Sequence, residues 1–108
     1  MSKTSHAELR PVKRKRGQYV FRLFMAGGGT NSRQAMVNLR RLCKEHLSGR
    51  FTIETIDVTK NFEAAVSNNI LVTPALVMVT PRPQVVILGN LSDPRKVLVA
   101  LRLSESES

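Results

Sequence analysis

A chain of 108 residues has room for one small domain with tails, and its apolar fraction of 42% is ordinary for a globular protein. No apolar run approaches the roughly 18–20 residues of a membrane span, and no apolar stretch follows the charged N-terminus as in a signal peptide. A single cysteine, Cys43, excludes an internal disulfide and a Cys-x-x-Cys redox pair. We therefore expect a cytoplasmic protein without a membrane partner.

The net charge of +9 divides the chain into three parts. Residues 1–18 carry +5, including Lys-Arg-Lys-Arg at 13–16, and we expect a disordered basic arm there. Residues 19–103, the expected domain, hold eleven basic and five acidic side chains, and the tail at 104–108 is acidic. A basic surface attracts nucleic acid, anionic lipid or an acidic protein. No aromatic side chains interleave the charges of the arm, which argues against the stacking of single strands, and nucleic acid is not the partner that we expect.

The first half of the domain reads as strand, helix and strand. Tyr19 to Met25 is apolar on both alternating faces apart from Arg22, which is typical of a strand covered on both sides. A glycine-rich segment leads into a helix with apolar residues at spacings of three and four up to Leu47, and Thr30, Asn31 or Ser32 is its expected N-cap. Phe51 to Val58 is rich in β-branched residues and forms the second strand, parallel to the first.

The glycine-rich segment and Cys43 both lack the surroundings of a reactive site. Gly27-Gly28-Gly29 matches neither the Walker pattern nor the spaced-glycine dinucleotide fingerprint, so we expect a permissive turn and not a phosphate site. Cys43 lies on the apolar stripe of the helix, which predicts a small core residue. His6, His46 and Cys43 do not cluster at metal-ligand spacing, so we expect no metal and no cofactor.

Pro74 is the central feature of the second half of the domain. Asn61 is expected to cap a short helix running through Phe62, Ala65 and Val66 to about Asn69. Pro74 then opens a buried strand over 75–79, because proline cannot donate to a sheet ladder, and a cis bond is worth suspecting at this position. A short proline-rich turn predicts an antiparallel hairpin with a strand over 85–88.

The last segment, 97–103, has both helical and strand-like spacing. The preceding Ser92-Asp93-Pro94 is a helix start, with a capping acceptor followed by proline in the first turn, and it favours helix. The predicted order is βαβαββα in an α/β domain with a mixed sheet, which is the thioredoxin-like architecture. In an oxidoreductase of this fold the redox cysteines would lie within residues 27–32, where this chain has none.

Over about residues 19–103 the sequence resembles the KaiB family of circadian clock proteins. The matching segments are Tyr19-Val20, Met25-Ala26-Gly27, Asn31-Ser32, Ile56-Asp57-Val58, Lys60-Asn61, Ile70-Leu71, Thr73-Pro74, Pro83, Gly89, Leu91-Ser92-Asp93 and Lys96-Val97-Leu98. The resemblance implies a non-catalytic protein that binds a KaiC-like ring ATPase, in circadian timing or stress signalling. It also implies a KaiA-like protein or a histidine kinase as a further partner, and it leaves a homo-oligomer open. Two other functions stay open: a thioredoxin-fold thiol or glutathione-binding protein, and a nucleic-acid binder that uses the basic arm.

The family also implies two alternative folds for the second half, the thioredoxin-like form and an oligomeric ground-state form with the order βαββααβ. Pro74 stands at the boundary between the two halves. Ala100 and Arg102 replace a usual Gly and Asp, and both changes favour helix, so we expect the thioredoxin-like form. Asn69, Met78, Val85 and Val86 stand where basic residues are common in the family. Our candidates for partner contacts are Lys60, Asn69 and Arg82, expected near one end of the sheet.

Overall fold

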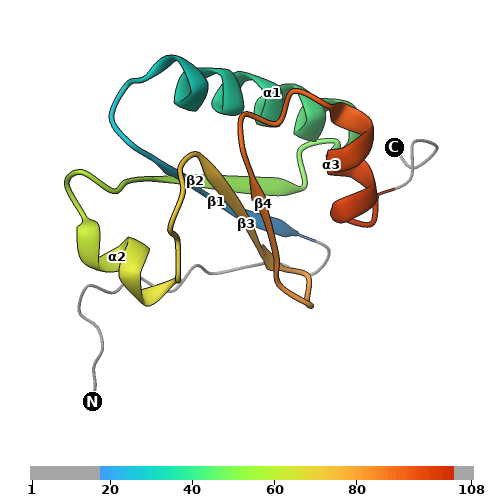
Figure 1. Ribbon diagram of the computed structural model, residues 1–108. Helices are drawn as coiled ribbons and strands as arrows, with labels where there is room; N and C mark the ends of the chain where they lie inside the picture. Colours follow the sequence, from blue (N-terminus) through green and yellow to red (C-terminus); the bar gives the residue numbers. More distant parts are fainter. Residues whose placement is uncertain (1–17, 104–108) are drawn as a thin grey trace.

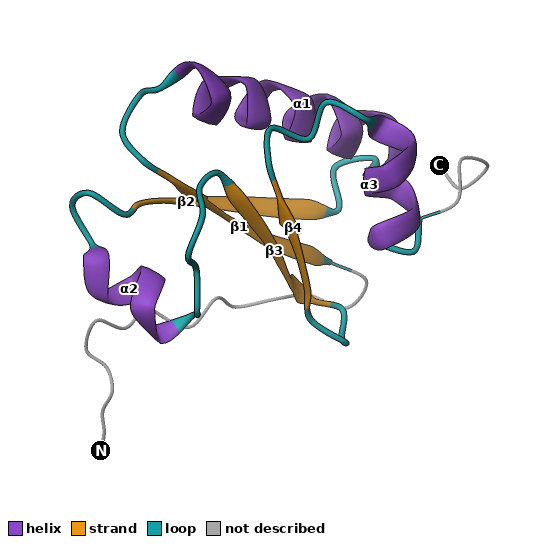
Figure 2. Cartoon of the chain, in the orientation of Figure 1, coloured by secondary structure: helices purple, strands orange, loops and turns teal. Residues whose placement is uncertain are grey.

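The computed structural model describes residues 18–103, which form one mixed sheet with helices on both faces (Figures 1 and 2). The elements in chain order are β1 (Tyr19–Met25), α1 (Thr30–Leu47), β2 (Phe51–Asp57), α2 (Phe62–Ser67), β3 (Ala75–Thr80), β4 (Val85–Leu88) and α3 (Pro94–Ala100). The predicted βαβαββα order is confirmed. The acidic tail and the basic arm, except for Gln18, lie outside the described residues.

The strands are ordered β2-β1-β3-β4 across the sheet. β1 pairs in parallel with β2 and antiparallel with β3, and β3 and β4 form the predicted antiparallel hairpin. β1 is central because both of its faces are apolar: Phe21 and Leu23 face one side and Phe24 the other, all with no exposed surface. Arg22, the polar exception, donates from Nε to Glu54 Oε1 on β2 at 2.8 Å.

Two apolar cores lie on opposite sides of the sheet. The larger joins α1 and α3 to one face, and the smaller joins α2 to the other. Figure 1 shows α1 on one side of the sheet and α2 on the other, with α3 beside α1. α2 has six residues and buries just Ala64 and Ala65, so it covers much less of its face than α1 covers. Every helix within residues 18–103 is too short or too polar to cross a lipid bilayer.

The start of α1 differs from the prediction. Gly29 occupies the N-cap position with an extended backbone, and no side chain caps the helix. The expected caps, Thr30, Asn31 and Ser32, already lie inside the helix, and Ser32 is buried. Glycine is an acceptable N-cap, so the segment that looked like a loop supplies the cap itself.

The other helix starts are confirmed. Asn61 Oδ1 accepts a hydrogen bond from Ala64 N at 3.1 Å, and Asp93 Oδ1 accepts one from Lys96 N at 3.3 Å. Pro94 follows Asp93 in the first turn, so residues 94–100 form a helix and not a strand. Three boundaries shift: β2 ends at Asp57, α2 ends at Ser67 and β3 continues to Thr80.

Candidate functional site

The turn between β1 and α1 lies beside Thr73-Pro74, at the end of the sheet where Phe24 pairs with Ala75. The Thr73–Pro74 peptide bond is cis and Pro74 is buried. Facing it, residues 26–29 supply backbone and no reactive side chain, and Gly27 needs its positive φ of 65° for the turn. This end of the sheet therefore has the geometry of a thiol site without a thiol.

Cys43 is remote from that turn and is shielded from solvent. It lies fourteen positions into α1, packed in the larger core with no exposed surface. Burial raises the pKa of its thiol to about 12, so the reactive thiolate is almost unpopulated at neutral pH. Cys43 thus behaves as a small apolar residue in this fold, as its place on the helical stripe predicted.

Asp57 fixes the loops at the same end of the sheet. Its Oδ1 accepts hydrogen bonds from Gly27 N at 3.1 Å, Thr59 N at 3.0 Å and Thr59 Oγ1 at 2.6 Å. The bond from the Thr59 hydroxyl, followed by those from the Gly27 and Thr59 amides, lowers the pKa of the Asp57 carboxyl. All three of these hydrogen bonds join the two turns, so Asp57 holds the loops at this end of the sheet.

Four of the eight large apolar side chains that are exposed within the described residues gather around α2. We call the set Phe62, Val66, Leu71 and Val72 the α2 surface; their exposed fractions are 70%, 58%, 93% and 52%. Phe62 and Val66 are four residues apart and share one face of the helix, opposite the buried Ala64 and Ala65. Soluble proteins seldom leave several large apolar side chains this exposed together unless something covers them.

The chain at the end of α2 turns Leu71 and Val72 outward. Asn69 has a φ of 59°, Asn69 N donates to Val66 O, and Ile70 N donates to Ala65 O. These two bonds form a Schellman motif, which is usually anchored by an apolar residue after the left-handed one. Ile70 is that anchor and is buried, so the two residues after it leave the helix on the outside.

The sequence missed this surface. The sequence indicated a short helix through Phe62, Ala65 and Val66 without saying which face is buried. In the structure Phe62 and Val66 lie on the outer face, and Ala64 and Ala65 form the inner one. The signal was present in the pair Ala64-Ala65, because small side chains let a short helix approach a sheet closely. A six-residue helix has too few turns for periodicity to show which stripe is buried.

The three predicted contact residues do not lie together. Lys60 precedes α2 and Asn69 follows it, so these two flank the α2 surface. Arg82 lies in the turn between β3 and β4, at the opposite end of the sheet from Lys60. The prediction that all three lie near one end is wrong, because β3 runs antiparallel to β1 and ends where β1 begins.

Ala100 and Arg102 lie at the C-terminal end of α3. Ala100 is the last helical residue and not an interior one, so its effect on helix formation is smaller than an interior substitution would give. Arg102 has a φ of 61°, a left-handed conformation outside the helix. Within residues 18–103 no group of three His, Cys, Asp or Glu residues is arranged to hold a metal ion.

Comparison with known sequences finds one family over nearly the whole described domain. The KaiB domain model matches residues 22–103. Circadian clock oscillator protein KaiB of Microcystis aeruginosa is 40% identical over 89 residues, which cover 82% of this chain and 86% of that protein. Circadian clock protein KaiB3 of Synechocystis is 38% identical over 82 residues, or 76% of this chain and 80% of that protein.

Comparison with solved structures supports the thioredoxin-like fold. The N-terminal domain of SasA from Synechococcus elongatus superimposes with a TM-score of 0.67 at 18% identity, covering 91% of this chain and 93% of that domain. Chloroplastic thioredoxin z superimposes with a TM-score of 0.65 at 19% identity, covering 81% and 79%. At these identities the likeness concerns the fold alone.

Proposed function

The chain belongs to the KaiB family of circadian clock proteins, and from that premise we propose that it is a non-catalytic regulator that docks on a KaiC-like ring ATPase. The observation that carries the proposal is the α2 surface, whose four large apolar side chains are all more than half exposed. Burial of apolar surface of this kind drives protein association, and aromatic side chains such as Phe62 are enriched at protein interfaces. The ATPase is the occupant that the family suggests for this surface.

The turn between β1 and α1 supports the non-catalytic part of the proposal. It places backbone amides next to Pro74, with no thiol, and the single cysteine is buried elsewhere with a raised pKa. A thiol or glutathione enzyme would need a nucleophile at this turn. The fold is thioredoxin-like but has no nucleophile at this turn, and we propose the α2 surface as the part that binds a partner.

Lys60 and Asn69 flank the α2 surface and are proposed as its polar rim. Lys60 carries a charge that would attract an acidic patch of the ATPase, raising the association rate more than the affinity. The backbone of Asn69 is held in a left-handed conformation at the end of α2, and its side chain is exposed. Arg82, at the other end of the sheet, is not part of this rim.

We assign the cytoplasm as the location, since the proposed partner depends on ATP. The work of the complex is circadian timing or the related signalling, and a KaiA-like protein or a histidine kinase would join it as a further partner.

Substitution on the α2 surface tests the proposal. Phe62→Ser and Leu71→Ser should each weaken binding to the KaiC homologue of the same genome by about 30-fold, since truncating a central anchor costs about 2 kcal/mol. Isothermal titration calorimetry with and without ATP measures the affinity. Val99→Ser is the matched control, because Val99 is 77% exposed on α3 and lies outside the α2 surface.

Two results would overturn the proposal. One is the absence of any binding to the ATPase in either nucleotide condition. The other is an equal loss of affinity in the Val99→Ser control, which would mean that exposed apolar residues matter in general and not those at α2.

A further inference from the structure

The whole net charge of the protein resides in one helix, one neighbouring residue and the N-terminal arm. Residues 1–18 contribute +5, α1 contributes +3 and Arg50 contributes +1, which together equal the total of +9. The rest of the chain holds six basic and six acidic side chains and is neutral. A charge so unevenly distributed creates a field on one side of the molecule.

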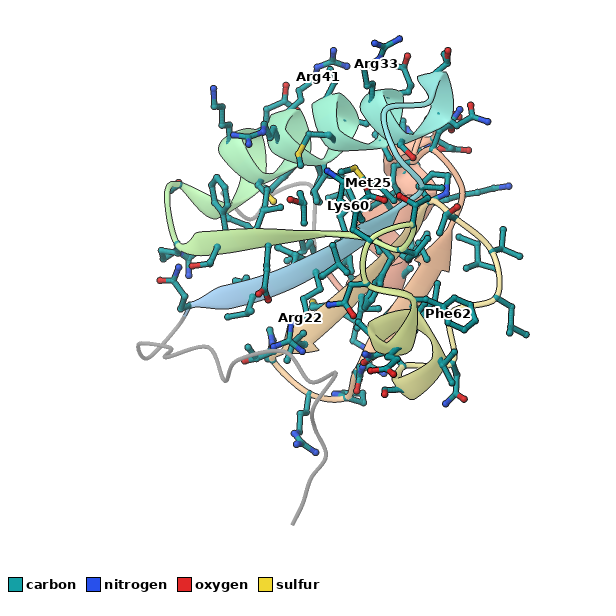
Figure 3. The ribbon with its side chains drawn as sticks, turned by 90° about the vertical axis from the view of Figure 1, so that its left-hand side faces the viewer. Arg22, Met25, Arg33, Arg41, Lys60 and Phe62 are labelled. Carbon is teal, nitrogen blue, oxygen red and sulfur yellow. The ribbon has the colours of Figure 1, made fainter. Side chains whose placement is uncertain are left out.

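Four cationic side chains form a stripe along the outer face of α1. We call Arg33, Arg40, Arg41 and Lys44 the α1 stripe; all four are exposed. At 100° per residue they fall within one third of the helix circumference, opposite the buried residues Ala35, Leu39 and Leu42. The stripe extends about 16 Å along the axis, at 1.5 Å per residue. Figure 3 shows Arg33 and Arg41 on the outer side of α1, away from the sheet.

These cations are available to a ligand. None of the four forms a salt bridge or a side-chain hydrogen bond with another residue of the described range. The one acidic residue of α1, Glu45, lies at the edge of the stripe and leaves a net excess of three positive charges. Unpaired like charges along one helix face repel one another, and an array of anions would relieve that repulsion.

The N-terminal arm joins the domain at the end of the sheet where α1 finishes. Tyr19 N donates to Arg50 O at 2.9 Å, directly after the last turn of α1. Arg50 is itself exposed, and it adds a cation beyond the Lys44 end of the α1 stripe.

We propose that the α1 stripe, extended by Arg50, binds double-stranded DNA through its backbone phosphates. The ligand is a regular linear array of anions, which matches a straight row of cations. Three of the four cations of the stripe are arginines, whose planar fork donates two hydrogen bonds to one phosphate. No side chain is placed to select a base, so binding is independent of sequence.

Other ligands fit the outer face of α1 less well. A protein-binding surface has an apolar centre depleted of charge, whereas surfaces that bind DNA are strongly positive. Val37 is the one large apolar side chain exposed on α1, too little for insertion into a membrane. Single strands need exposed aromatic rings, and Phe62, the one exposed aromatic side chain of the described residues, lies on the other side of the sheet.

The DNA-binding face and the α2 surface lie on opposite sides of the sheet (Figure 3). The protein could therefore hold DNA and the proposed ATPase at the same time. The inference does not depend on the ATPase, because it rests on α1 and Arg50 alone.

Two triple variants of the full-length protein test the inference at equal net charge. One is Arg33→Gln, Arg40→Gln and Lys44→Gln on the α1 stripe. The other, the control, is Lys60→Gln, Arg82→Gln and Lys96→Gln, which removes three positive charges elsewhere from exposed positions. Fluorescence anisotropy with a short labelled duplex of mixed sequence measures affinity between about 50 and 200 mM salt. Circular dichroism checks that both variants fold.

We expect the two variants to differ in the salt dependence of their binding to the duplex. The wild type binds with an affinity that falls steeply with salt, and the α1 variant lowers the slope of log K against log salt by about 3, one unit for each lost phosphate contact. The control keeps the wild-type slope. Adding Arg50→Gln to the α1 variant should lower the slope by about one more unit.

Four results would overturn the inference. They are no binding of duplex by the wild type at about 50 mM salt, an equal loss of slope in both triple variants, tighter binding of the single strand than of the duplex, and equal or tighter binding of polyglutamate or phosphatidylserine vesicles. The last would identify the ligand as an acidic protein or a membrane.

Discussion

At the scale of single residues, Asp57 has the most consequential contacts of any carboxylate in the described domain. One oxygen accepts three hydrogen bonds that join the turn after β1 to the turn after β2. These turns border Pro74 and lead into α2, so Asp57 positions the segment that precedes the α2 surface. The protonated carboxyl is a poorer acceptor than the carboxylate, which ties this contact to pH.

We expect Asp57 to give the fold a specific sensitivity to acid. Its folded pKa lies below the ordinary value of 3.8, so its contribution to stability is complete above 3.8 and is lost as the pH falls through the folded pKa. Asp57→Asn should therefore lower the melting temperature at neutral pH, and the difference from wild type should shrink below pH 3.8. Thermal melts followed by circular dichroism across this range measure it.

Glu45→Gln serves as the control for Asp57→Asn, because it removes a carboxylate from α1 without touching the two turns. The difference in melting temperature between Glu45→Gln and wild type should not shrink below pH 3.8 as it does for Asp57→Asn. If the difference in melting temperature between wild type and Asp57→Asn stayed constant at every pH, the charge on Asp57 would not contribute to stability.

At the scale of secondary-structure elements, α2 and α3 end in the same way. In α3, Arg102 N donates to Val99 O and Leu103 N donates to Leu98 O, with Arg102 in the left-handed region. Leu98 and Leu103 are both buried, as the apolar contact of a Schellman motif requires. The end of α2 uses Asn69, a residue that tolerates this conformation, but Arg102 does so at a cost.

Arg102→Gly should stabilise the domain. Relieving the left-handed conformation of a non-glycine residue contributes about 1 kcal/mol, and the loss of a basic residue near the helix C-terminus removes a few tenths. The net gain should raise the melting temperature by a few degrees, as expected for a domain of this size. Thermal denaturation measures the change.

Lys96→Gly is the matched control for Arg102→Gly. Lys96 lies inside α3, where glycine costs about 1 kcal/mol, so the same substitution should lower the melting temperature. If Arg102→Gly lowered it too, the side chain of Arg102 would have a stabilising contact that outweighs its backbone conformation.

At the scale of the whole molecule, the sequence predicts the architecture well and the surfaces poorly. The alternation of Tyr19 to Met25, the helical stripe ending at Leu47 and the capping residues Asn61 and Asp93 each determine local structure, and all were confirmed. The N-cap of α1 was missed because glycine carries no side-chain signal. Lys60 and Arg82 lie at opposite ends of the sheet, and Phe62 faces outward. Both placements depend on tertiary packing, which a local sequence pattern does not contain.

The conformation of residues 97–103 in solution is the last prediction, and it concerns the packing of the whole domain. As a helix and its cap, this segment buries Val97, Leu98, Leu101 and Leu103 in the larger core and leaves Val99 77% exposed. A strand would put Val97, Val99, Leu101 and Leu103 on one face and remove Leu98 from the core, because strand side chains alternate. Burial of Leu98 contributes roughly 2 kcal/mol to the helix, which burial of the smaller Val99 in the strand would offset only in part.

We expect ¹³C secondary shifts of the free protein to show helix over residues 94–100 and strand over residues 75–80, which act as the internal reference. Leu98→Ser removes the apolar contact that distinguishes the two arrangements, so it should reduce the helical shifts of α3 while those of α1 stay unchanged. Strand-like shifts over residues 97–103 in the wild type would contradict the prediction. In that case the second half would adopt the packing with a strand at residues 97–103, although the buried leucines favour the helix.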